Sequence, residues 1–142
     1  MCGARASGGE LVTHAELEDW VVRFTDAFNR EDLDGVMAFF ADDGVYDEFD
    51  GTRRVGKASI RAAFEPQFRG DFGRMRFVSE DLFVDPASGK GLIRWLCTTE
   101  RNGVKRGWRG LDLLHFANGK LVEKHTYAKA ERPKLEEVLT KS

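Results

Sequence analysis

The second half of the chain is divided by turn signals into long segments that alternate in polarity as β-strands do. Residues 86–89 (PASG), Asn102-Gly103 and Asn118-Gly119 are typical of tight turns between antiparallel strands. They separate four predicted strands, which span about residues 74–85, 91–101, 105–117 and 120–130. Consecutive strands joined by hairpins form an antiparallel meander, which constrains the fold more than any other feature of this sequence.

The first half of the chain carries helical patterns instead. Thr13 and Glu16 form a capping box, and they precede apolar residues at helical spacing: Leu17, Trp20, Val21, Phe24 and Phe28. The patterns predict helices over about residues 14–29, 32–41 and 57–68. Asp42-Asp43-Gly44 is predicted to end the second helix, ahead of a strand over 45–49 and a turn at 50–51. A charged helix is predicted over 133–140.

Helices grouped ahead of a run of strands indicate the α+β class. A chain of 142 residues suits one domain with its own hydrophobic core. We therefore predict a single domain over residues 13–142, preceded by a flexible tail over residues 1–12. The last strands carry apolar residues on both faces. One face is predicted to cover the helices and a cavity, and the other to form a homodimer.

The composition limits the partners of the protein. A net charge of −2 provides no electrostatic basis for binding nucleic acid or an acidic membrane surface. No segment has the apolar length of a membrane span or a signal peptide. Cys2 and Cys97 lie far apart in the sequence, so we expect no disulfide and a cytoplasmic protein. No cluster has metal-ligand spacing, and we predict neither a metal nor a cofactor.

Asp112 is the strongest candidate for a functional residue. It interrupts the apolar run at residues 110–116 (GLDLLHF), where a buried carboxyl group is costly unless it is paired or hydrogen-bonded. Such groups often mark a functional site or a structural ion pair. Asp112 is therefore predicted to be a polar group inside an apolar cavity.

The partner of Asp112 depends on how the last hairpin turns. A three-residue loop with a bulge at residues 117–119 would place Lys124 and Thr126 on the face of Asp112. A two-residue turn at Asn118-Gly119 would place His125 there instead. The first register makes Asp112 an ionised partner of Lys124, and the second makes an acid–base pair with His125.

Aromatic side chains are predicted to surround Asp112. The predicted lining consists of Trp20, Phe24, Phe28, Trp95, Cys97, Trp108, Lys124 and Thr126. Such a lining favours a flat, apolar or aromatic ligand, although the same residues could serve only as core. Cys97 is predicted to be an inert buried thiol.

Two groups of basic residues are interrupted by few acidic residues. They are Arg53, Arg54 and Arg61, and Arg101, Lys105, Arg106 and Arg109. Basic residues of this kind usually form solvated faces or protect strand edges. The alternative is a phosphate or carboxylate partner.

Four segments carry recognisable motifs: residues 40–48 (FADDGVYDE), 56–61 (GKASIR), 110–116 (GLDLLHF) and 118–123 (NGKLVE). Together they resemble the NTF2-like superfamily, and more narrowly its SnoaL-like and ketosteroid-isomerase-like branch, over about residues 14–130. The resemblance implies a cone in which three N-terminal helices pack on a strongly curved antiparallel sheet around one open pocket. Members of this superfamily are commonly dimeric, so the resemblance also implies a dimer.

The ketosteroid-isomerase-like pattern implies roles for particular residues. Asp112 falls on the acid of the oxyanion hole, and Glu48 falls on the general base. The position of a helical tyrosine that completes the oxyanion hole is Phe24 here, which has no hydroxyl group to donate. Tyr46 shares a strand face with Glu48 and is a candidate donor to the ligand.

The expected function is therefore that of a cofactor-free isomerase or cyclase, which transfers a proton on a small hydrophobic carbonyl compound. Its predicted catalytic residues are Glu48, Asp112 and Tyr46. The superfamily hosts many unrelated activities. A non-catalytic small-molecule-binding or protein-interaction module is the alternative, and a hydrolase or dehydratase of the same superfamily is a further one.

Overall fold

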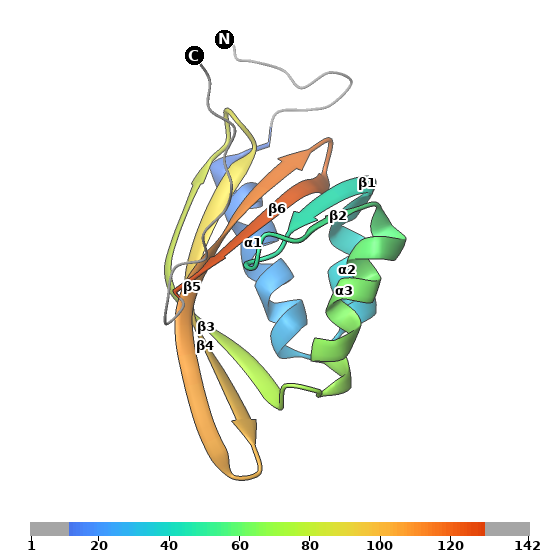
Figure 1. The fold of residues 1–142 in the computed structure, drawn as a ribbon. Coiled ribbons are helices and arrows are strands. Elements are labelled where there is room, and N and C mark those ends of the chain that lie inside the picture. The colour runs from blue at the N-terminus through green and yellow to red at the C-terminus, as the bar shows by residue number, and fades with distance from the viewer. Residues whose placement is uncertain (1–11, 130–142) are drawn as a thin grey trace, which may run out of the picture.

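The computed structural model describes residues 12–129, which form three helices and six strands (Figure 1). The elements are α1 (His14–Asn29), α2 (Leu33–Phe39), β1 (Phe40–Asp47), β2 (Arg53–Val55), α3 (Lys57–Arg69), β3 (Arg74–Asp85), β4 (Lys90–Arg101), β5 (Val104–Ala117) and β6 (Lys120–Ala128). The helix predicted over 133–140 and most of the predicted tail over 1–12 lie outside the described residues.

The six strands form one sheet in the order β2-β1-β6-β5-β4-β3. Neighbouring strands are antiparallel except β1 and β6, which are parallel. The sheet curves, and the helices lie on one side of it (Figure 1). These features confirm the predicted α+β class and the predicted arrangement of three helices on a curved, mostly antiparallel sheet.

Helix α1 forms as the sequence predicts. Thr13 Oγ1 accepts a hydrogen bond from Glu16 N (3.1 Å) and Glu16 Oε1 accepts one from Thr13 N (2.9 Å), which confirms the capping box. The helix packs against β3 and β4. At its end, the side-chain amide of Asn29 donates to Phe77 O (2.8 Å) and accepts from Phe77 N (2.7 Å). These bonds fix the end of the helix to β3.

The first strand begins earlier than predicted. Helix α2 ends at Phe39, and β1 begins at Phe40, so the prediction that residues 42–44 end the helix is wrong. Phe40 is fully buried and pairs with Leu121 of β6. This tertiary contact outweighs the helical spacing of Phe40. The sequence also does not signal β2, which pairs with the end of β1.

The last hairpin combines the two predicted alternatives. Ala117 pairs with Lys120, so Asn118-Gly119 is a two-residue turn, and both of its residues have positive φ (54° and 76°). The pairing then shifts by one residue beyond the turn, because of a bulge in β6. Because of the bulge, the residues beyond it face the side expected for the three-residue loop. Thr126, and not His125, therefore lies opposite Asp112.

No helix within residues 12–129 is both long enough and apolar enough to span a membrane. The predicted cytoplasmic location stays a prediction.

Candidate functional site

A cavity of about 960 Å³ opens between the sheet and helices α1 and α3. Aromatic side chains from both layers line it: Phe28, Tyr46, Phe64, Phe77, Trp95 and Trp108. Two pairs of rings are in contact, since Tyr46 stacks on Phe64 with 4.8 Å between ring centres, and Phe77 meets Trp95 edge to face at 5.1 Å. A cavity of this size and lining suits an apolar ligand with one or more rings.

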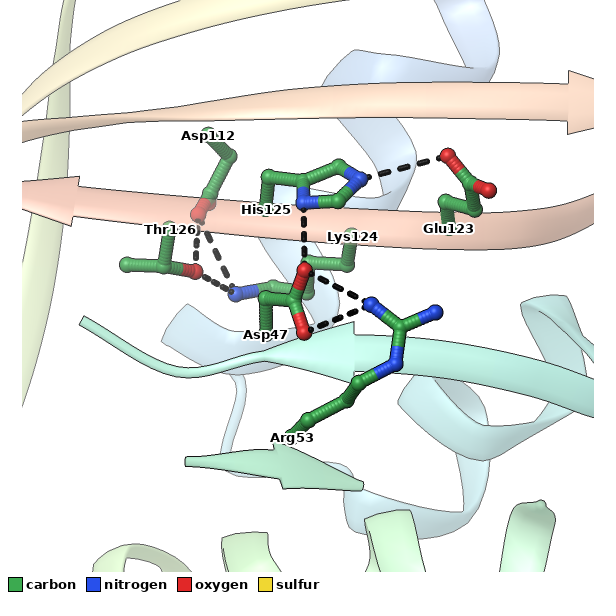
Figure 2. Close-up of polar contacts among 7 residues, drawn as sticks. All are labelled: Asp47, Arg53, Asp112, Glu123, Lys124, His125 and Thr126. Atoms are coloured by element: carbon green, nitrogen blue, oxygen red, sulfur yellow. Dashed lines mark hydrogen bonds and ion pairs between the residues drawn. The ribbon is translucent and has the colours of Figure 1, made fainter. Parts of the chain in front are cut away.

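Asp112 lies in this cavity and accepts hydrogen bonds from three side chains. Its Oδ1 accepts from Lys124 Nζ (3.1 Å) and from Thr126 Oγ1 (2.6 Å), and its Oδ2 accepts from Trp95 Nε1 (3.2 Å). Figure 2 shows Thr126 and Lys124 on β6 pointing toward Asp112 on β5. Because every one of these partners donates, Asp112 acts as a carboxylate that holds other groups in place.

Lys124 is the cation that balances Asp112. Its side chain is nearly buried, and Nζ also donates to Thr126 Oγ1 at 2.6 Å. Burial lowers the pKa of Lys124, but its interactions with neighbouring groups, first of all the charge of Asp112, raise it by more, so that the net shift is upward. The group therefore stays an ammonium ion. It has three N–H donors, and Asp112 and Thr126 take only two of them.

Tyr46 places a phenol next to this ammonium. The ring centre of Tyr46 is 4.4 Å from Lys124 Nζ, close enough for a cation–π contact. Burial raises the pKa of Tyr46 above its ordinary value of 10.0. The hydroxyl group therefore keeps its proton at neutral pH and can donate a hydrogen bond.

Glu48 lines the same cavity from the segment that follows β1. Its side chain is 17% exposed, and Oε2 accepts a hydrogen bond from Arg54 Nε at 2.7 Å. Arg54 belongs to β2 and also lines the cavity. Because the sequence does not signal β2, this partner of Glu48 could not be predicted.

Three of the residues predicted to line the cavity lie elsewhere. The Trp20 ring packs on Phe116 with 5.4 Å between ring centres. Phe24 of α1 is buried against the start of β1, where its ring meets Phe40 edge to face. Cys97 is fully buried, and burial and Asp112 raise its pKa to about 12, as expected of an inert thiol. Helical and strand periodicity identify an inward face, but they do not separate core positions from cavity positions.

The remaining predicted lining residues do face the cavity: Phe28, Trp95, Trp108, Lys124 and Thr126. Phe64 was missed as a site residue, although its helical spacing with Ile60 marks it as inward-facing. Its stacking on Tyr46 could not be read from the sequence, because α3 and β1 meet only in the folded chain.

His125 lies on the opposite face of β6, so the predicted pairing with Asp112 in the second register is wrong. Its Nδ1 is 2.8 Å from Asp47 Oδ2, and its Nε2 is 3.2 Å from Glu123 Oε1. Arg53 Nη1 is 3.2 Å from both carboxylate oxygens of Asp47 (Figure 2). This cluster connects β2, β1 and β6. Within residues 12–129, no group of three or more His, Cys, Asp or Glu could hold a metal ion.

Gly110 leaves room for the Trp95 ring, and we expect Gly110→Ala to lower the free energy of unfolding by about 1–3 kcal/mol. A Cβ atom at this position would lie closer than 3.0 Å to the carbonyl oxygen of Tyr127 and to the Trp95 ring. Urea unfolding measures the loss. Gly107→Ala on the same strand is the milder comparison, for which a smaller loss is expected, because its Cβ would come no closer than 3.0 Å to a neighbour, Cys97 O. Equal stability of wild type and Gly110→Ala would contradict the expected clash.

A family model described as a SnoaL-like domain matches residues 21–124. The fold is similar to that of a proposed polyketide cyclase from Xanthomonas campestris pv. campestris (TM-score 0.71, 20% identity, 80% of this chain and 90% of that chain). It is also similar to an NTF2-like protein of unknown function from Mesorhizobium loti (TM-score 0.69, 22% identity, 82% and 93%). A third similar structure is AclR, a proposed hydroxylase from Streptomyces galilaeus (TM-score 0.70, 19% identity, 82% and 91%). Comparison with curated proteins yields no match.

Proposed function

Because the chain belongs to the SnoaL-like domain family, we propose that it is a cofactor-free isomerase or cyclase that transfers a proton on a small hydrophobic carbonyl compound. The family match agrees with the resemblance in the sequence. Proposed polyketide cyclases among the similar structures are consistent with this activity, although at this level of identity they support only the fold.

The observation that carries the proposal is the set of polar groups in one aromatic cavity. Glu48 is a carboxylate, and Lys124 and Tyr46 are donors that face the same space. In the proposed reaction, Glu48 removes a proton from the carbon next to the carbonyl group. The ammonium of Lys124 and the hydroxyl of Tyr46 then stabilise the negative charge that develops on the carbonyl oxygen.

This proposal changes the role expected of Asp112. The resemblance implies a protonated acid that donates to the oxyanion, whereas Asp112 accepts hydrogen bonds from Lys124, Thr126 and Trp95. We assign it a positioning role, in which it keeps Lys124 charged and directed into the cavity. The donor to the oxyanion is then Lys124, with Tyr46.

The test is solvent deuterium exchange into β-tetralone, a bicyclic ketone with acidic protons next to its carbonyl group. The protein is expected to accelerate exchange at that carbon, as measured by NMR, above the rate in buffer with heat-denatured protein. The absence of acceleration, with binding of the ketone in calorimetry, would contradict an enzyme of this kind.

A non-catalytic binding module is the second candidate, and the ion pairs of the cavity favour it. Asp112 is paired with Lys124, and Glu48 is paired with Arg54. In this candidate, both acids serve as structural partners of the two cations. This candidate predicts that the ketone binds without exchange.

We also propose that the outer face of the sheet forms a homodimer. Apolar side chains on that face include Val78, Phe83, Leu96, Leu111, Leu113 and Tyr127. Of these, Val78, Phe83 and Tyr127 are each more than half exposed in the isolated chain. Exposed apolar groups gathered on one sheet face are typical of an interface.

Tyr127→Asp is expected to convert this dimer to a monomer, because the new charge would be buried in the apolar interface. Light scattering coupled to size-exclusion chromatography measures the molar mass. Val22→Asp is the control, since Val22 is 40% exposed but lies on α1, away from the sheet face. A wild-type protein that is monomeric at every concentration would contradict the proposal.

A further inference from the structure

Two exposed arginines lie at the opening of the cavity. Arg101 and Arg106 belong to the β4–β5 hairpin, and both are exposed and line the cavity. Within residues 12–129, neither forms an ion pair or a side-chain hydrogen bond. The long hairpin that carries them extends well beyond the rest of the sheet (Figure 1).

Other charged residues also lie near the opening, and Asp50 is one that lines the cavity. Arg54 is paired with Glu48 on the opposite wall. Asp71, which follows α3, is held by Arg69 through two hydrogen bonds of 3.1 and 2.6 Å. Arg101 lies close enough to Asp71 to help lower the pKa of that carboxyl group, but neither arginine of the hairpin has a direct ion pair within residues 12–129. An arginine offers a planar fork of donors that suits a carboxylate or a phosphate group.

One face of β5 joins Arg106 to the inner polar groups. Asp112, Gly110, Trp108 and Arg106 occupy alternate positions of β5, so they lie on the same face. Asp112 and Arg106 are six residues apart, which corresponds to roughly 20 Å along an extended strand. A ligand that reaches from the inner donors to the rim must therefore be elongated, and Trp108 lies along its path.

The rim, meaning the exposed residues around the opening of the cavity, also carries apolar side chains. Phe49, Phe72 and Val104 line the cavity, and each is more than half exposed. They come from three different segments: the residues after β1, those after α3, and the β4–β5 hairpin. Exposed apolar groups around an opening offer contact area to a ligand whose body extends out to the rim.

We infer that Arg101 and Arg106 form a subsite for the anionic end of an elongated apolar ligand, a carboxylate or a phosphate, whose rings lie against Trp108 and Trp95. The inference rests on the proposed function, because it assigns a substrate class to the same cavity. The substrate is then a multi-ring or ring-and-chain carbonyl compound with an acidic group at the end remote from Lys124.

The test compares three fluorescent probes with the same ring system: pyrenebutyric acid, pyrenebutyl phosphate and the neutral pyrenebutanol. At low ionic strength, at least one anionic probe is expected to bind roughly tenfold more tightly than the alcohol, as measured by calorimetry. The tighter of the two anionic probes identifies the preferred group. The difference is expected to shrink as salt is added, because the arginines are exposed.

The double variant Arg101→Gln/Arg106→Gln is expected to remove this preference and to leave the affinity for pyrenebutanol unchanged. The matched control is Arg76→Gln/Lys105→Gln, which removes the same charge from residues that do not line the cavity. If wild type binds all three probes with equal affinity, the proposed anionic subsite is wrong, whereas the proposed binding of apolar ligands in the cavity is retained. An equal loss of preference in both double variants would also overturn it. If no probe binds, the proposed small-molecule function fails as well.

Discussion

Replacing Lys124 with methionine is expected to lower the free energy of unfolding by about 3–5 kcal/mol. Methionine occupies a similar volume but cannot pair with Asp112, so the variant retains a buried carboxylate without its cation. Lys124 and Asp112 are 4% and 8% exposed, so water cannot readily replace the lost ammonium. Urea unfolding at pH 7, followed by circular dichroism, measures the change.

The pH of this measurement matters. Because the pKa of Lys124 is raised in the folded protein, its contribution to stability is present in full below its ordinary value of 10.5. The contribution is lost only as the pH rises through the folded-state value. Measurements at pH 7 therefore report the whole effect of the ion pair.

The control for Lys124→Met is Lys120→Met, at an exposed position of the same strand. Its effect is expected to stay below about 1 kcal/mol. The double variant Asp112→Leu/Lys124→Met should be more stable than Lys124→Met alone, because it leaves no unpaired charge in the cavity. If Lys124→Met is as stable as wild type, Asp112 does not depend on this ammonium, and its positioning role is wrong.

Glu48→Gln is expected to lower the rate of deuterium exchange into β-tetralone by about 10²–10⁴-fold. Glutamine keeps the shape of the side chain and can still accept a hydrogen bond from Arg54, but it cannot take up a proton at neutral pH. Since the Arg54 pair is partly exposed, the free energy of unfolding should change by less than about 1 kcal/mol. The affinity for the ketone should be retained.

The control for Glu48→Gln is Glu65→Gln, an exposed carboxylate of α3 that does not line the cavity. It is expected to exchange at the wild-type rate. Arg54→Gln adds a second measurement, because it removes the ion-pair partner of Glu48 and keeps the carboxylate. Unchanged exchange in Glu48→Gln would exclude Glu48 as the base and would favour the binding module.

Part of the candidate site could be predicted from the sequence, because some signals are local. Asp112 stands out as an acid within an apolar strand, and Trp95 and Trp108 stand out as large inward-facing aromatics. The sequence could not identify Lys124 as the partner of Asp112, since it allowed two registers. The side chain that stacks on Tyr46 and the arginine that pairs with Glu48 come from α3 and β2, whose positions depend on long-range contacts.

By itself, the sequence determined the order of helices and strands apart from β2, the capped start of α1 and the turn at Asn118-Gly119. Caps, periodicity and Asn-Gly turns act over a few residues, so they can be read locally. The tertiary structure alone decided where β1 begins, because Phe40 pairs with Leu121 across the sheet. It also decided the bulge in β6, which places Lys124 beside Asp112 and turns His125 to the opposite face. Strand register depends on pairing between distant segments, and a shift of one residue exchanges the two faces of a strand.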